Sequence, residues 1–140
     1  MRVALVAIVL LIACEGTSAP IPLPHPSGAY VATGCKGVLA ASTVTPVAMP
    51  CPYSGASSSA IVIDSSRMVF AGDSVAWRVV YFQSNTRHYD TVLTTYHVQS
   101  DSVISFSAWP SFAPGSTVLA MPDGGVRWTG YWNYIFFTKQ

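Results

Sequence analysis

The chain has 140 residues, of which 51% are hydrophobic and only 9% are charged, and its formal net charge at pH 7 is +1. This length allows one domain with a single core. The chain has neither a dense basic patch nor an acidic tail, and this argues against a protein that binds nucleic acid.

The first 13 residues have the pattern of a secretory signal. Arg2 is followed by Val3–Ala13 without a charge, which matches a positive n-region and an apolar h-region. The apolar run is about 11 residues long, whereas a helix needs roughly 20 to cross a bilayer. We predict a signal peptide over residues 1–13, and the short run argues against a permanent transmembrane anchor.

Two cleavage sites compete after this run. Thr17-Ser18-Ala19 has the small residues that signal peptidase prefers, but Pro20 follows directly and fits a protease subsite poorly. The other site, Leu11-Ile12-Ala13-Cys14, resembles the lipobox of bacterial lipoproteins. The resemblance implies cleavage before Cys14, acyl chains on Cys14 and an anchor in the membrane of the bacterial cell envelope. Glu15, in place of an aspartate, favours the outer membrane.

A proline-rich stretch separates the leader from the body of the chain. Proline recurs at positions 20, 22, 24 and 26, which favours polyproline II and prevents sheet pairing. At about 3.1 Å per residue, the segment can extend roughly 40 Å. We predict a lipidated cysteine with a spacer over 14–27 and one domain over 28–140. Without Arg2, six basic and six acidic residues remain, so the retained chain has a formal charge of 0.

The cysteine count is consistent with lipidation. The chain has three cysteines, and a lipid on Cys14 leaves Cys35 and Cys51 as a pair in an oxidising compartment. A disulfide that closes this loop stabilises by about 3 kcal/mol in the chain-entropy model. Free buried thiols or a metal pair are the alternatives, although the absence of nearby histidines argues against zinc.

From residue 28 onward the sequence is typical of an all-β domain, with β-branched and aromatic runs between turn residues. The only helical candidate is 36–49, which Pro46 limits. Turns or loops are expected at 65–66, 71–73, 84–90, 100–101 and 122–125. The expected strands are 58–64, 67–70, 74–83, 91–99, 102–109, 116–121 and a long final strand over 126–139.

Alternation assigns the faces of these strands. On 74–83, the residues Val75, Trp77, Val79 and Tyr81 share one face. On the final strand we expect one inward set and one outward set. The inward set is Trp128, Trp132, Tyr134 and Phe136, and the outward set includes Tyr131, Ile135 and Phe137.

A sequential meander of about eight strands removes its edges best by closing into a small up-and-down barrel; a two-sheet β-sandwich is the alternative. Leader, lipobox, spacer and a meander with an aromatic last strand resemble small lipocalin-like lipoproteins of bacteria. Gly28-Ala29-Tyr30 stands where lipocalins have Gly-x-Trp, with tyrosine in place of tryptophan. The resemblance implies a barrel that carries a small apolar ligand.

Motifs for catalysis or metal binding are lacking. His25, His88 and His97 have no metal-ligand spacing, and no G-x-S-x-G elbow occurs. Turn chemistry accounts for most of the aspartates. We therefore expect no enzyme, no metal and no cofactor.

Two functions follow from this pattern. The first is a lipid-anchored envelope module that binds a protein or polymer without catalysis; the second is a lipocalin-like carrier. A packed interior would favour the module, and a large apolar cavity the carrier. Candidate partner-facing residues are Tyr131, Ile135 and Phe137. Candidate ligand-facing residues are Trp77, Tyr81, Trp128, Trp132, Tyr134 and Phe136.

Overall fold

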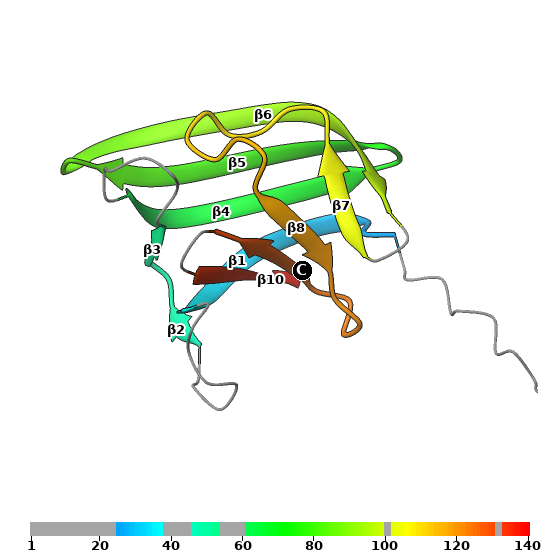
Figure 1. Cartoon of the computed structure of the whole chain (residues 1–140), viewed down its shortest axis with the longest axis horizontal. Coiled ribbons are helices and arrows are strands. Elements are labelled where there is room, and N and C mark those ends of the chain that lie inside the picture. The colour runs from blue at the N-terminus through cyan, green and yellow to red at the C-terminus, as the bar shows by residue number, and fades with distance from the viewer. Residues whose placement is uncertain (1–24, 38–45, 54–60, 100–101, 131–132) are drawn as a thin grey trace, which may run out of the picture.

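The computed structural model describes residues 25–37, 46–53, 61–99, 102–130 and 133–140, and within these ranges all regular structure is β (Figure 1). The strands are β1 (Gly28–Gly37), β2 (Val47–Ala48), β3 (Cys51–Tyr53), β4 (Ile61–Ala71), β5 (Ser74–Gln83), β6 (Thr86–Val98), β7 (Val103–Phe106), β8 (Thr117–Ala120), β9 (Val126–Thr129) and β10 (Asn133–Lys139). Accordingly, no helix in the described residues is long and apolar enough to span a membrane.

All ten strands belong to one antiparallel sheet, in the order β2-β1-β10-β9-β8-β7-β6-β5-β4-β3. A further pairing between β1 and β4 closes eight of them into a barrel, with β2 and β3 as additions. The predicted meander and its closure are confirmed, in preference to a two-sheet sandwich. The long strands β4, β5 and β6 lie side by side as one curved wall (Figure 1).

The predicted polar loop over 84–90 is wrong. The β5–β6 connection is a two-residue turn at Ser84 and Asn85, whose φ angles are +51° and +62°. A tight hairpin turn of this kind needs positive φ at both positions, and asparagine tolerates it well. β6 therefore starts at Thr86, and the polar residues that follow lie on an exposed strand.

The predicted break at 65–66 is also wrong, because β4 runs through it with a β-bulge. The pairing with β5 shifts between Ile63 and Ser65, so Asp64 is the extra residue. The shift changes which residues point inward: Ile63 is buried before it, and Ser66 and Met68 are buried after it. The bulge thus lets both halves of the strand bury their apolar residues.

The predicted final strand is in fact a hairpin. β9 ends at Thr129, and the backbone N–H of Gly130 donates to the carbonyl of Asn133 at 2.8 Å. β10 then pairs with β9 in the antiparallel direction. The alternation over 126–139 therefore does not continue across the turn.

Two short strands fill the place where β1 and β4 diverge. These long strands pair only through Gly28–Val31 and Arg67–Phe70; beyond that, β1 pairs with β2 and β4 pairs with β3. Where the structure describes the helical candidate 36–49, that prediction is wrong, because its ends belong to β1 and β2.

The predicted disulfide is confirmed. Cys35 of β1 is bonded to Cys51 of β3, with their Cα atoms 6.0 Å apart. Both cysteines are buried, so the bond joins β1 to β3, the short strand that pairs with β4, from inside the wall.

Candidate functional site

The interior of the barrel holds a continuous set of aromatic rings. Trp77 of β5 and Trp128 of β9 are fully buried, and their rings meet edge to face with centroids 4.8 Å apart. Trp128 also contacts Tyr53 of β3 at 4.7 Å, and Trp77 contacts Phe106 of β7 at 5.5 Å. Ring pairs of this geometry stabilise beyond the area that they bury.

Both buried indoles have a serine partner. The Nε1–H of Trp77 donates to the hydroxyl of Ser66 at 3.0 Å, and that of Trp128 donates to Ser116 at 2.8 Å. Each serine hydroxyl in turn donates to a main-chain carbonyl, of Arg78 and of Ala113 respectively. The polar atoms of the two rings are thus satisfied within the protein, as buried donors require.

The connection between β7 and β8 also packs into this core. The ring of Phe112 packs against the rings of Tyr81 and Tyr53, with centroid separations of 4.4 Å and 5.6 Å, respectively. Asp90 of β6 holds the loop, because its carboxylate accepts hydrogen bonds from the backbone N–H and hydroxyl of Ser111 at 2.7 and 2.9 Å. This role of Asp90 does not follow from its turn-like sequence context, although the aromatic and proline content of "WPSFAPG" is a signal for a buried loop.

The structure brings together only some of the candidate ligand-facing residues. Trp77, Tyr81 and Trp128 lie inside, in contact with other rings, as alternation predicts. Tyr134 and Phe136 do not point inward; that expectation is wrong, because the β9–β10 turn reverses the alternation. Both are half-buried on the outer face. Trp132 lies outside the described residues.

The candidate partner-facing set requires the opposite correction. Ile135 and Phe137 are only 0% and 2% exposed and belong to the core, so neither can contact a partner. Tyr131 lies outside the described residues. On the outer face the guanidinium of Arg127 stacks over the ring of Tyr134 at 4.5 Å.

The outer wall of β4, β5 and β6 carries the most exposed apolar groups. Leu93 is 77% exposed and Tyr89 is 70% exposed. In the strand register, Val69, Ala76 and Leu93 lie opposite one another in one row across the three strands. The row lines an open groove of about 730 Å³. Exposed apolar surface of this kind is typical of a contact surface.

A pair of arginines lies beside this apolar row. Arg67 and Arg78 are both exposed and stand directly opposite each other across β4 and β5. Neither forms an ion pair with a residue that the structure describes, in contrast to Arg87, which binds Asp64 at 3.0 Å. Like charges in this position destabilise a sheet.

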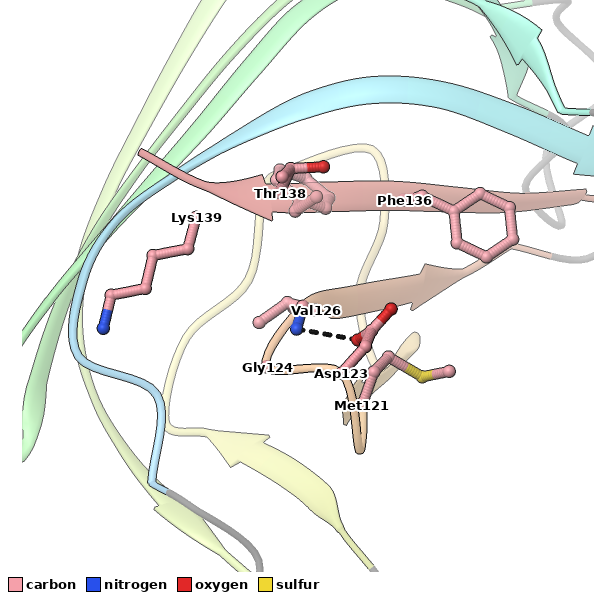
Figure 2. Close-up of a pocket in the computed structure, with 9 residues that line it drawn as sticks. Met121, Asp123, Gly124, Val126, Phe136, Thr138 and Lys139 are labelled. Carbon is pink, nitrogen blue, oxygen red and sulfur yellow. Dashed lines mark hydrogen bonds between the residues drawn. The ribbon is translucent and has the colours of Figure 1, made fainter.

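A second, smaller hollow of about 360 Å³ lies beside the β8–β9 turn (Figure 2). Its walls include Met121, Phe136 and Lys139. Figure 2 also shows that Asp123 turns toward its own loop, where Oδ1 accepts the N–H of Gly125 at 2.9 Å. The Nζ of Lys139 reaches Ser27 at 3.4 Å. Asp123 therefore bonds within the turn, and Lys139 bonds to Ser27, the residue before β1.

The titratable groups in the described part of the chain form no obvious catalytic set. His25 and His97 are exposed, and His88 stacks on Tyr81 with ring centroids 5.2 Å apart. The described residues hold no group of three or more His, Cys, Asp or Glu side chains that could bind a metal.

Two buried phenols have altered acidity. Burial raises the pKa of Tyr53, partly offset by a hydrogen bond with Ser116. Burial also raises the pKa of Tyr96, with smaller contributions from Asp73 and Tyr30. The Tyr96 hydroxyl donates to the carbonyl of Pro26 at 2.9 Å, which ties the residues before β1 to the barrel.

Comparison of the chain with protein-family models, with curated proteins and with solved structures finds no match.

Proposed function

We propose that this protein is a lipid-anchored module of the bacterial cell envelope that works by binding another envelope protein through the outer wall of β4, β5 and β6. The observation that carries the proposal is the contrast between the two sides of this wall. Its inner side is covered by packed rings such as Trp77, whereas its outer side exposes Leu93 and Tyr89. A protein that only binds a partner needs an exposed contact surface and does not need a catalytic group or a metal.

The anchor in this proposal rests on the leader. The sequence Leu11-Ile12-Ala13-Cys14 ends the apolar run, and the disulfide between Cys35 and Cys51 leaves Cys14 as the one remaining cysteine of the chain. Cells grown with labelled palmitate should label the wild-type protein, whereas Cys14→Ser should remain unlabelled. Equal labelling of both proteins would refute the anchor.

Site-specific photo-crosslinking tests the contact surface. A photoreactive residue at Leu93 of β6 should give one discrete adduct in cells that produce the full-length protein. Thr138 is the matched control, because β10 lies four strands from β6 in either direction around the barrel and Thr138 is exposed. Adducts of equal yield and pattern at both positions would show that the wall is not a specific contact surface.

The alternative function is a carrier of a small apolar molecule, which the lipocalin resemblance implies. Such a carrier needs room inside the barrel. The contacts of Phe112 with Tyr81 and Tyr53 fill the space beneath the β7–β8 connection, and they favour the binding module over the carrier.

A further inference from the structure

The arginine pair on the outer wall has no ion-pair partner among the residues that the structure describes, and like charges at opposed positions destabilise a sheet. Arg67 and Arg78 stand opposite each other across β4 and β5, where the Cβ atoms of opposed residues lie about 5 Å apart. Their neighbours in the same row are Val31 of β1 and Thr91 of β6, neither of which carries a charge. An anion placed between the two guanidinium groups would remove the repulsion, and a carboxylate matches their planar donors well.

The pair has a fixed relation to the apolar row. Val69, Ala76 and Leu93 each lie two positions along their strand from Arg67, Arg78 and Thr91, respectively. Two residues of an extended chain span roughly 6.6 Å and point the same way. Consider an extended segment of a partner that runs parallel or antiparallel to these strands. If one of its side chains lies over the arginines, the side chain two residues further along lies over Leu93.

We infer that the outer wall docks an extended polypeptide segment in which an acidic residue and an apolar residue stand two positions apart. The carboxylate binds Arg67 and Arg78, and the apolar side chain packs on Ala76 and Leu93. The inference rests on the proposed function and specifies the partner. A polyanionic polymer fits less well, because it gains from many cations, whereas this row offers two and the neighbouring row is apolar.

Labelled peptides test the inference with the full-length protein, by fluorescence anisotropy. The probe is an octapeptide of two Glu-Ser-Leu-Ser repeats, which puts both types of side chain on one face when it is extended. The first control has two Glu-Leu-Ser-Ser repeats, with the same composition but glutamate and leucine on opposite faces. The second control replaces each glutamate of the probe by lysine, and the third is an octamer of glutamate alone.

The probe should bind, and all three controls should bind at least about tenfold more weakly, a difference of about 1.4 kcal/mol. Arg67→Gln with Arg78→Gln should reduce probe affinity by about tenfold or more, and added salt should weaken binding of the probe to the wild type. Lys139→Gln is the matched control, because it removes an exposed charge from β10 and should leave the affinity unchanged. Equal binding of the two leucine–glutamate peptides, of the lysine peptide or of the glutamate octamer would overturn the inference.

Thermal unfolding separates a binding role of the arginines from a structural one. Because the pair is repulsive, Arg67→Gln with Arg78→Gln should keep the melting temperature or raise it. A marked fall would mean that the arginines support the fold, and it would overturn the inference. A specific adduct at Leu93 that survives this double substitution would refute the inference alone. Adducts of equal yield at Leu93 and Thr138 in the protein that keeps both arginines would refute the proposed function itself.

Discussion

At the scale of single residues, the indole N–H of Trp77 is a buried donor of the core whose acceptor is a single side chain. The ring is fully buried, and its donor has the Ser66 hydroxyl as acceptor. Ser66 is itself buried, and its hydroxyl donates a second hydrogen bond to the main-chain carbonyl of Arg78. A buried donor that loses its acceptor keeps its full desolvation penalty.

Ser66→Ala should therefore lower the free energy of unfolding by about 1–3 kcal/mol, as measured by denaturant titration. Ser65→Ala is the matched control. Ser65 is the adjacent residue, exposed on the other face of β4, and its substitution should change stability by less than about 0.5 kcal/mol. If the two variants lose the same stability, the serine does not support the indole.

The raised pKa of Tyr96 predicts a pH dependence. A phenol whose pKa is higher in the folded state than the usual 10.0 stabilises the fold at any pH below about 10, and this stabilisation is lost as pH rises through the folded value. The free energy of unfolding should thus decline above about pH 10. Tyr96→Phe should flatten this decline, whereas Tyr89→Phe, at an exposed position, should leave it as in the wild type. A profile unchanged by Tyr96→Phe would contradict the assignment.

At the scale of elements, the β9–β10 hairpin decides the faces of the last strand. Gly130 stands at the turn because a Cβ there would lie 2.7 Å from the Tyr53 ring. The strand that follows places Ile135 and Phe137 in the core. The residue pair that best tests this arrangement is Ile135 and Tyr134.

Ile135→Ala should cost about 2–5 kcal/mol of stability, because it empties a fully buried site. Tyr134→Ala should cost only about 1 kcal/mol, the size of the stacking with Arg127 that it removes. Chemical unfolding of both variants measures the difference. A larger loss for Tyr134→Ala would restore the originally predicted faces.

At the scale of the whole molecule, closure of the barrel depends on strands far apart in sequence. β1 reaches β4 at one end and β10 along its length, and the disulfide spans the gap where β1 and β4 separate. The β7–β8 connection then packs Phe112 against Tyr81 and Trp128. Rings therefore cover the inner side of the β4–β6 wall, and its outer side exposes Leu93 and Tyr89.

The contacts of Phe112 with Tyr53, Tyr81 and Trp128 predict that the wild-type protein does not take up an apolar fluorescent dye such as N-phenyl-1-naphthylamine. Phe112→Ala should destabilise the protein by less than the roughly 3–5 kcal/mol that truncation of a fully buried phenylalanine costs, because Phe112 is half-buried. It should also open a cavity lined by Tyr81, Tyr53 and Trp128. Dye binding should then appear in the variant, measured under conditions where circular dichroism shows it folded. Saturable uptake by the wild type, with one dye per protein, would favour the carrier function instead.

Alternation of side chains along a strand predicts the inward residues of β5 but not those of β10. Val75, Trp77, Val79 and Tyr81 could be assigned to the interior because they lie on one uninterrupted strand. Ile135 and Phe137 could not, because β9 and β10 are separate antiparallel strands and the alternation of one does not fix that of the other. Asp64 shifts it in β4 for a similar reason, since a bulge adds one unpaired residue. The arginine pair could not be predicted from the sequence either, because only the register of β4 and β5 places Arg67 opposite Arg78.

The sequence by itself determined the all-β class and the sequential meander, and it predicted the pairing of Cys35 with Cys51 with free thiols or a metal pair as alternatives. These depend on local patterns: β-branched and aromatic runs, turn residues and the number of cysteines. Only the tertiary structure decided which side chains of β10 lie inside and that Phe112 packs against Tyr81 and Tyr53. It also decided that Arg67 and Arg78 share one exposed row. Those features depend on strand register and on contacts between distant segments, and a one-residue shift in register moves every side chain to the other face.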